Sequence, residues 1–492
     1  MRRVPGNAGP RRDRAPRCVS PRSFPGANDV TPGMAAAWPL LATDDLDAPL
    51  AWRAGTPVSA RQFLADSQAL AERLPDHGPM VNLCGDRYAF AVGLAAALRR
   101  GQASWMPPNV LPDTLARLGG AGAHLYGLSD DPSIAAPGLP MLQAPHGPAR
   151  LSEAAAKVPS IPTAQLAACL LTSGSTGAPQ PHAKTWGALA LNIGAEARRL
   201  AETLARPSLA GLTVVATVPA QHSYGFESSV LLAMLGGAAF DSGRPYFPAD
   251  IAAALARVPR PRALVTTPFH LKTLLQSGVV LPAVDLVLSA TAPLSPQLAL
   301  QAERAFGGLL VEIYGCTEAG QVATRRTVVG EVWQTFDALR LHREDGPEGE
   351  RFVVQGGHVL EPTPLADVLQ LADATHFRLF GRANDLIHVA GKRSSLGHLN
   401  FHLNSIDGVV DGAFWLPDEV ADGVVRPVAF VVAPSLTVAD VVAALRQRIE
   451  PVFVPRRIVF VEALPREATG KLTTQVLREF ARVHLDGGAG AA

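Results

Sequence analysis

One hydroxyl-rich loop carries the residue types best suited to binding phosphate. It occupies positions 170–180 and reads Leu-Leu-Thr-Ser-Gly-Ser-Thr-Gly-Ala-Pro-Gln. Consecutive backbone N–H groups in such a loop form a concavity that suits phosphate oxygens. The candidate phosphate ligands are Thr172, Ser173, Gly174, Ser175, Thr176 and Gly177. The spacing lacks the G-x-x-x-x-G-K-[ST] pattern, which disfavours an ordinary P-loop kinase or ATPase.

The elements around this loop disfavour a flexible Ser/Gly linker. Residues 166–171 predict a buried strand before the loop, and residues 186–200 predict a helix after it. Further upstream, the pattern predicts a helix over 59–74 whose apolar face is interrupted by Ser67, a strand over 80–83 and an amphipathic helix over 87–98. The loop therefore lies between packed elements.

Short apolar runs recur downstream, and each ends in a polar or glycine-containing turn. They occupy residues 212–218, 264–267, 286–288 and 309–313, with helical patterns between several of them. This alternation predicts an α/β fold with a mostly parallel sheet, in which ligands bind beyond the carboxyl ends of the strands. We expect these turns to meet the phosphate loop at one cleft. The candidate pocket residues on the turns are His222, Tyr224, Gly225, Ala290 and Gly315.

Composition excludes several other classes of protein. A net charge of +1 over 492 residues gives no reason to expect nucleic acid or an anionic membrane as the main partner. The longest apolar stretch, at 230–240, is too short to span a bilayer. Four scattered cysteines indicate neither a disulfide scaffold nor a zinc site and fit a reducing cytoplasm. The oligomeric state is not indicated.

The first 33 residues are rich in arginine and proline and lack an apolar signal core. This composition predicts a disordered, solvated tail, and Met34 is a candidate for the true start.

Several motifs in order resemble those of the adenylate-forming enzymes, the superfamily of acyl- and aryl-CoA synthetases, peptide-synthetase adenylation domains and luciferases. The loop resembles T-S-G-S-T-G-x-P, and Tyr314-Gly315-Cys316-Thr317-Glu318 resembles Y-G-x-T-E. Residues 381–393 resemble G-R-x-D-D-x-I-K-x-x-G-x-R, and residues 464–471 resemble L-P-R-x-x-x-G-K. Residues 219–225 resemble the acyl-pocket motif P-x-x-H-x-x-G. The resemblance covers roughly residues 50–475.

This resemblance implies a role for each matching residue. Tyr314 would stack on adenine, Thr317 would contact phosphate, and Glu318 would help to hold Mg²⁺. Asp367 would accept the ribose hydroxyls, although Leu365-Ala366 replaces the usual Thr-Gly before it, and Arg382 would lie nearby. Lys471 would bridge carboxylate and phosphate oxygens, assisted by Arg393.

The resemblance also implies two domains joined by a hinge. The expected division is an adenylate-forming domain over 34–382 and a small α+β domain over 383–492, with Asn384 as the hinge. In the small domain the pattern predicts strands at 412–416, 427–432 and 457–461, a helix at 438–449 and a closing helix at 472–483.

Departures from the motifs are specific. Gln180-Pro181 stands where Lys-Gly is usual, and Lys184 is the candidate to restore the charge. The segment around Lys184 resembles a branch associated with aryl polyene and xanthomonadin-type pigment clusters. After Arg393, residues 394–400 replace the usual glutamate-containing segment.

The expected function is ATP- and Mg²⁺-dependent activation of a carboxylic acid, such as a hydroxybenzoate, with transfer to a thiol. The acceptor would be CoA or the phosphopantetheine of an acyl carrier protein. Alternatives are a medium- or long-chain fatty acyl-CoA synthetase, a non-catalytic nucleotide-binding relative and a carrier-docking subunit.

Overall fold

A computed structural model gives the fold of most of the chain. The described residues are 36–43, 45–107, 109–119, 124–136, 138–145, 147–151, 157–173, 179–346, 349–382, 386–389, 392–417, 427–466 and 472–486. The predicted tail over 1–33, residues 174–178 of the phosphate loop, Asn384 and Lys471 lie outside them.

The first sheet of the large domain has six strands in the order β10-β9-β5-β4-β6-β7 among the described residues. These strands are Pro179–Thr185 (β10), Leu166–Ser173 (β9), Ser104–Met106 (β5), Met80–Asn82 (β4), Tyr126–Ser129 (β6) and Met141–Gln143 (β7). All neighbours are parallel except β9 and β10, which form an antiparallel pair. The segment between the predicted strand and helix is therefore a hairpin whose second strand was not predicted.

Within the described part of the chain, the second sheet has eleven strands in the order β21-β22-β17-β16-β15-β14-β13-β11-β12-β2-β3. These are Asp367–Leu371 (β21), His376–Arg382 (β22), Trp333–Thr335 (β17), Gly320–Arg325 (β16), Leu309–Cys316 (β15), Leu286–Ser289 (β14), Arg262–Thr266 (β13), Thr213–Ala216 (β11), Ala239–Asp241 (β12), Pro49–Arg53 (β2) and Thr56–Ser59 (β3). The strands from β15 to β2 are parallel, as the sequence predicts, and both ends of the sheet are antiparallel.

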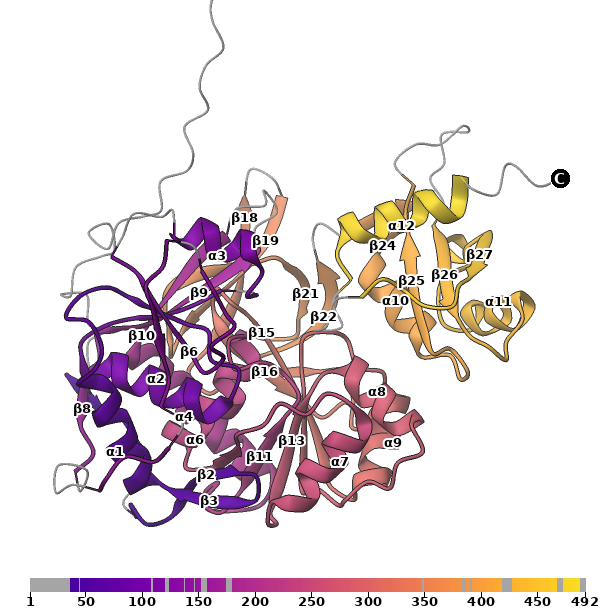
Figure 1. Ribbon diagram of the computed structural model, residues 1–492. Coiled ribbons are helices and arrows are strands. Elements are labelled where there is room, and N and C mark those ends of the chain that lie inside the picture. The colour runs from indigo at the N-terminus through magenta and orange to yellow at the C-terminus, as the bar shows by residue number, and fades with distance from the viewer. Residues whose placement is uncertain are drawn as a thin grey trace, which may run out of the picture.

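Helices cover both sheets and fill the space between them (Figure 1). The helical segments of the large domain are Ala60–Ala71 (α1), Arg87–Arg99 (α2), Pro112–Gly119 (α3), Trp186–Thr203 (α4), Ser223–Gly225 (α5), the π-helix Phe226–Leu231 (η3), Leu232–Gly236 (α6), Pro248–Arg257 (α7), Pro268–Gln276 (α8) and Pro296–Phe306 (α9). Side chains of α2, α4 and α6 belong to one hydrophobic core that includes residues from both sheets. The two sheets are thus held together by a shared apolar interior.

Of two helix predictions, one is wrong and one is confirmed. The α2 helix is not amphipathic, because almost all of its residues are buried between the sheets. Even Arg87 is 1% exposed, and its guanidinium donates to the Val218 carbonyl at 2.9 Å. On α1, Ser67 interrupts the apolar face, as predicted. It lies on that face, and its hydroxyl donates to the Leu64 carbonyl at 3.0 Å.

Smaller sheets complete the large domain. An antiparallel three-stranded sheet that was not predicted consists of Arg340–Gly346 (β18), Gly349–Gly356 (β19) and Val359–Leu365 (β20). Ala37–Pro39 (β1) pairs with Ser160–Pro162 (β8).

The small domain follows β22 and is the orange-to-yellow part of Figure 1. Its strands are Leu386–Val389 (β23), Lys392–Ser395 (β24), Asp411–Trp415 (β25), Val428–Val432 (β26) and Arg457–Phe460 (β27), and its helices are Leu396–Asn404 (α10), Val438–Arg446 (α11), the short 3₁₀ turn Pro451–Phe453 (η5) and Thr474–Asp486 (α12). This pattern confirms the predicted small α+β fold. The helix α10, which was not predicted, begins where the Ser395 hydroxyl accepts the His398 N–H.

One lysine links the two domains. The Lys272 ammonium on α8 donates to the backbone carbonyl of Val409, just before β25. Burial lowers the pKa of Lys272 to about 8, although Asp411 nearby favours the charged form. Asp411 itself forms an ion pair with Arg466, with 2.7 Å between Nε and Oδ2.

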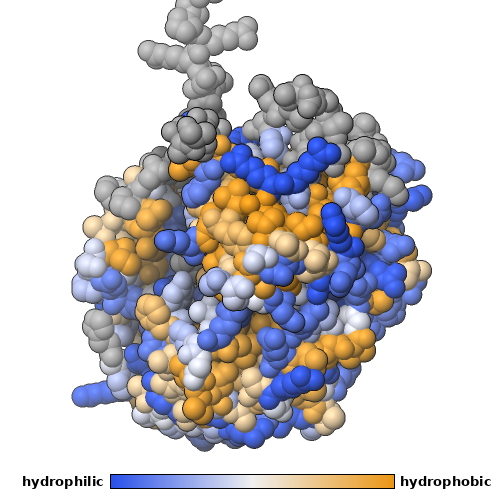
Figure 2. Space-filling view, turned by 90° about the vertical axis from the view of Figure 1, so that its right-hand side faces the viewer, coloured by the Kyte–Doolittle hydropathy of each residue, from blue (hydrophilic) through white to orange (hydrophobic). Residues whose placement is uncertain are grey.

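The surface seen from the small-domain side mixes apolar and charged residues (Figure 2). Among the described residues, no helix combines the length and apolar character needed to cross a bilayer.

Candidate active site

A cavity of about 350 Å³ opens beside the carboxyl ends of β14 and β15. The turn after β14 contributes Thr291 and Ala292, and β15 contributes Glu312, Tyr314 and Gly315. The remaining walls come from the segment leading into β17, from β21 and β22, and from α10 of the small domain. Ligands of parallel α/β sheets bind at this edge. The cavity therefore lies where the sequence predicts the cleft.

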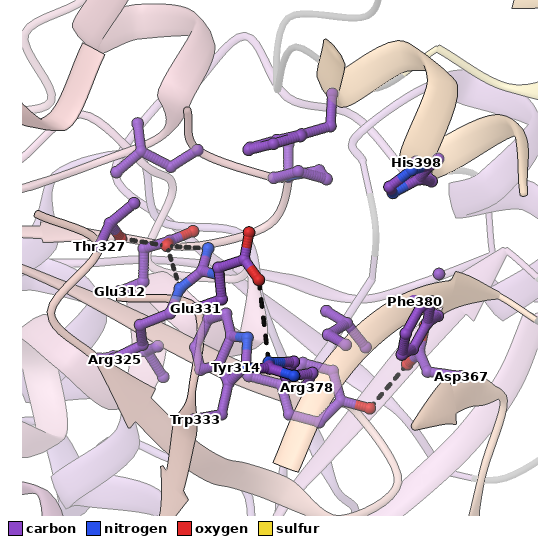
Figure 3. A pocket seen from close by; sticks show the side chains of 18 of the residues that line it. Glu312, Tyr314, Arg325, Thr327, Glu331, Trp333, Asp367, Arg378, Phe380 and His398 are labelled. Carbon is purple, nitrogen blue, oxygen red and sulfur yellow. Dashed lines mark hydrogen bonds and ion pairs between the residues drawn. The ribbon is translucent and has the colours of Figure 1, made fainter. Parts of the chain in front are cut away.

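The structure brings Tyr314 and Asp367 together in this cavity (Figure 3). The Tyr314 hydroxyl donates to Asp367 Oδ2 at 2.8 Å, across 53 residues of chain. The Tyr314 ring packs against Phe377 and Trp333, with ring centroids 5.6 and 5.8 Å away. Aromatic packing thus holds the Tyr314 ring in place, and the Asp367 carboxylate holds its hydroxyl.

A buried ion pair between β15 and the neighbouring strand β16 was not predicted. Glu312 precedes Tyr314 by two residues, so both side chains lie on one face of β15. Its carboxylate accepts Arg325 Nε at 2.8 Å and also the Thr327 hydroxyl. Burial raises the pKa of Glu312, and the charge of Arg325 opposes that shift. The period of two along β15 was the signal that could have found Glu312.

The other unpredicted wall residues come from both domains. His398 and His402 are one turn apart on α10, with ring centroids 4.5 Å apart, and Arg378 faces Glu331 at 3.8 Å. Burial lowers the pKa of both histidines, that of His402 to about 4. Both histidines are therefore neutral near pH 7.

Lys184 reaches the Y-G-x-T-E segment from the neighbouring sheet. Its ammonium donates to the backbone carbonyl of Glu318 at 2.7 Å. Burial lowers the pKa of Lys184, and the carboxylate of Glu227 is the strongest of the groups that oppose this shift. His182, also on β10, lies 3.9 Å from the Glu318 carboxylate. The structure thus brings Lys184 and His182 of β10 together with Glu318.

Lys184 and Gln180 occupy different places on β10. They are four residues apart, so they share a face of the strand but are separated by roughly 13 Å along it. Gln180 pairs with Thr172 of the phosphate loop, whereas Lys184 pairs with Ala168 deeper in the sheet. Lys184 therefore brings its charge to Glu318 and not to the place of the usual lysine.

Glu318 suits a magnesium ion that is bound mostly by phosphate. Its side chain is 51% exposed, so its carboxylate is open to a ligand. Mg²⁺ on a polyphosphate typically takes only one or two carboxylates from protein. In the part of the chain that the structure describes, no group of three or more His, Cys, Asp or Glu side chains could form a metal site without the substrate.

The predicted acyl-pocket residues differ in their exposure and in what they contact. His222 is exposed and its Nδ1 accepts the Tyr224 N–H, which caps α5. Tyr224 is buried, and Gly225 is needed because a Cβ there would lie 2.0 Å from the Pro219 carbonyl oxygen. Ala290 is buried beside Thr291, which lines the cavity with a φ of 79°.

The remaining predicted residues are only partly described. Thr172 and Ser173 end β9, Arg382 ends β22 and Arg393 lies in β24, but their side chains are outside the description. Gly174, Ser175, Thr176, Gly177, Asn384 and Lys471 lie outside it altogether.

Comparison with known proteins agrees with this geometry. The sequence profile of the AMP-binding enzyme family matches residues 135–338, and that of the AMP-binding enzyme C-terminal domain matches residues 403–471. A 4-coumarate–CoA ligase of Halorhodospira halophila is 32% identical over 314 residues, which cover 61% of this chain and 73% of the relative. The chain belongs to the adenylate-forming AMP-binding enzymes.

Solved structures of adenylate-forming enzymes share the fold. ATP-bound MatB from Rhodopseudomonas palustris aligns with a TM-score of 0.71 at 20% identity, over 89% of this chain and 97% of that one. The anthranilate CoA ligase AuaEII in complex with anthranoyl-AMP aligns with a TM-score of 0.74 at 15% identity, over 94% and 100%. These alignments confirm the large and small domains of the adenylate-forming fold.

Proposed function

We propose that this chain is an AMP-forming ligase that activates an aromatic carboxylic acid with ATP and passes the acyl group to a thiol. The observation that carries the proposal is the Tyr314–Asp367 hydrogen bond in the cavity at the carboxyl edge of the sheet. It presents an aromatic ring and a carboxylate together, which suits a nucleoside with a flat base and two ribose hydroxyls. The similarity to a 4-coumarate–CoA ligase supports an aromatic acid and CoA as the acceptor.

The reaction has two balanced steps. A carboxylate oxygen forms a bond to the α-phosphorus of ATP while the bond to pyrophosphate breaks. The thiol sulfur then bonds to the acyl carbon, AMP leaves, and the thiol proton passes to solvent. Phosphoryl chemistry of this kind depends mainly on positioning and charge neutralisation.

The described residues supply both positioning and charge neutralisation. The carboxylate of Asp367 would hold the ribose, and Tyr314 would hold the base and orient Asp367. Lys184 would place positive charge near the phosphates, beside Glu318. Glu318 would hold Mg²⁺, which supplies charge neutralisation when bound.

Two residues outside the described ranges complete the proposal. Lys471 would bridge the carboxylate and phosphate oxygens in the first step. Rotation of the small domain about Asn384 would withdraw Lys471 and admit the thiol, as in other enzymes that close and open around a substrate. We propose the boundary between residues 382 and 383 on the same grounds.

Pyrophosphate exchange into ATP tests the first step. A panel should contain hydroxybenzoates, cinnamates and fatty acids, and we expect exchange with at least one aromatic acid. Lys471→Ala should abolish exchange but leave thioester formation from a supplied acyl-adenylate largely intact. Exchange with no acid, together with no effect of Lys471→Ala, would leave only a nucleotide-binding, non-catalytic role.

The acceptor is tested separately. CoA and a phosphopantetheinylated acyl carrier protein are each mixed with enzyme, ATP and the preferred acid, and thioester is measured by mass. A hydroxybenzoate loaded only onto the carrier would support the aryl polyene or xanthomonadin-type branch, whereas CoA thioester formation would support a free aryl-CoA product.

A further inference from the structure

Six polar side chains meet in the interior next to the predicted acyl pocket. None is more than 6% exposed. They come from helix α4, from the segment α5–η3 and from strand β16, and we call them the buried polar cluster. Its members are Asn192, Glu196, Tyr224, Glu227, Ser228 and Gln321.

Many polar atoms of this cluster have no partner among the described residues. These are Asn192 Oδ1, both carboxyl oxygens of Glu196, the Tyr224 hydroxyl and Gln321 Oε1. A buried polar atom without a hydrogen bond costs about 1–3 kcal/mol, so five in one place form an unusual concentration. Something that supplies hydrogen bonds is therefore expected to occupy the site.

The unpaired atoms are mostly acceptors. The Gln321 amide N–H donates to the Ser228 hydroxyl at 3.0 Å, which leaves its carbonyl oxygen unpaired. Asn192 lowers the pKa of Glu227, which fits an amide N–H that faces the carboxylate, since a carboxylate only accepts. The oxygen of Asn192 then points elsewhere.

Glu196 adds a carboxyl group that is protonated near pH 7, so that one oxygen accepts and the other carries an O–H. Burial raises its pKa to about 8, and Ser228 and Gln321 oppose this shift without meeting hydrogen-bond geometry. A ligand that donates hydrogen bonds would satisfy Glu196, Asn192 and Gln321 together. An apolar ligand would leave all three unpaired.

The cluster borders the predicted acyl-pocket motif. Tyr224 lies in that motif, Glu227 follows it, and Ser228 is in the π-helical turn η3, a distortion frequent at functional sites. The charge of Lys184, which contacts Glu318, lowers the pKa of Glu227. A Cβ added to Gly320 would lie 3.2 Å from Asn192, so the Thr317–Gly320 turn borders the cluster directly.

We propose that the buried polar cluster forms the far end of the acid-binding site and selects carboxylic acids that carry an amino or hydroxyl group away from the reacting carboxylate. This assignment rests on the proposed function and specifies its substrate class. Gln321 and Glu196 are the specificity-determining residues, since they present the unpaired oxygens. A site built to hydrogen-bond a substrate O–H or N–H can reject the analogue that lacks it by a large factor.

The test uses matched acids and pyrophosphate exchange by the full chain. Benzoates and cinnamates with an amino, a hydroxyl or an isosteric methyl group at the same ring position are compared by kcat/KM. We expect the best amino or hydroxyl acid to exceed its methyl analogue by at least about tenfold. Comparing the amino with the hydroxyl acid then identifies the preferred donor.

Three variants give the decisive readout. Gln321→Leu and Glu196→Leu should each lower kcat/KM for the donor-bearing acid and maintain or raise it for the methyl acid, so that the preference falls to within about threefold. Glu196→Gln keeps an acceptor oxygen and should retain most of the preference for a hydroxyl. A purely structural role would lower stability without changing the ratio between acids.

Gln102→Leu is the matched control. Gln102 is also a buried glutamine, 6% exposed, but its amide donates to the Pro75 carbonyl in the region of β5, outside the site. The Gln102→Leu substitution should reduce the melting temperature and leave unchanged the ratio of kcat/KM between the donor-bearing acid and the methyl acid.

Two failures are distinguishable. If no acid supports exchange, the proposed function fails and the assignment fails with it. If exchange occurs but methyl acids match donor-bearing acids, or if Gln321→Leu and Glu196→Leu keep the wild-type ratio, the proposed function stands and the cluster holds only ordered water.

Discussion

The cavity beside Tyr314 and the buried polar cluster hold similar residue types but differ in how these are satisfied. In the cavity, Asp367 is paired with Tyr314, and Glu312 is paired with Arg325 and Thr327. In the cluster, Glu196 and Gln321 retain unpaired oxygens away from solvent. The chain thus preorganises its nucleotide end by itself, whereas its acid end is completed by what it binds.

The largest effect is expected at Lys184, which donates to the Glu318 carbonyl. Lys184→Met should lower kcat/KM for adenylate formation by about 100-fold or more, because a positioned charge near the phosphates is lost and the buried carboxylate of Glu227 loses a cation that favours its charged form. Pyrophosphate exchange measures the loss, and Lys184→Arg is the charge-retaining control.

A second change tests where that charge acts. Adding Gln180→Lys to Lys184→Met should recover less than about tenfold, because the two positions are roughly 13 Å apart along β10. Full recovery would show that Lys184 merely replaces the usual lysine of the loop.

Asp367 is expected to give the next largest effect. Asp367→Ala should raise the KM for ATP about 10- to 100-fold, the range for losing hydrogen bonds to a charged acceptor, with little change in acid preference. Steady-state kinetics with ATP varied at saturating acid provides the measurement. A changed ratio of kcat/KM between the donor-bearing acid and the methyl acid would contradict the separate roles of the cavity and the buried polar cluster.

Glu196 should give a smaller effect that appears in stability. Its folded pKa of about 8 lies above the ordinary value of 4.5, so between these pH values the folded chain holds a proton that the unfolded chain has lost. Stability should therefore fall as pH rises through this window, by up to about 1.4 kcal/mol for each unit of difference.

Glu196→Gln should remove this dependence. The melting temperature of the variant relative to the wild type should increase steadily from pH 5 to pH 8. A difference that stays constant across this range would show that Glu196 is ionised in the folded chain.

The smallest effect is expected from Tyr314→Phe. It keeps the ring packed against Trp333 and Phe377 and removes only the hydrogen bond to Asp367. The KM for ATP should rise by about fivefold, which corresponds to a net hydrogen bond of about 1 kcal/mol. Tyr314→Ala, which also removes the ring, should have a larger effect on the same measurement.

Sequence patterns predicted the parallel strands and small domain well because apolar runs and helical spacing report burial directly. They missed β10 because its sequence, Pro-Gln-Pro-His-Ala-Lys-Thr, has no apolar alternation and two prolines. An edge strand tolerates prolines, and β10 lies at the edge of its sheet. Its pairing with β9 is a tertiary property that local spacing does not encode.

The cluster was missed for a different reason. Asn192 and Glu196 lie on the same buried stripe of α4 as Leu189, Ile193 and Leu200. Two polar residues within an apolar stripe were a visible signal, but their meeting with Gln321 depends on packing across the fold. Motifs located Tyr314 and Asp367 because both belong to a recognisable pattern, whereas the acyl-pocket motif at 219–225 contains Tyr224 alone of the cluster.

Because Lys272 contacts the Val409 carbonyl, the position of the small domain relative to the large one should depend on pH. Separation of the domains would expose the ammonium to water and return its pKa from about 8 towards its ordinary value of 10.5. The separated arrangement would then bind more protons than the joined one in this range. Above pH 8, each separation of the domains would therefore take up part of a proton from the buffer. Alkaline conditions would favour the joined arrangement and slow the domain movement between the adenylation step and the thioester-forming step.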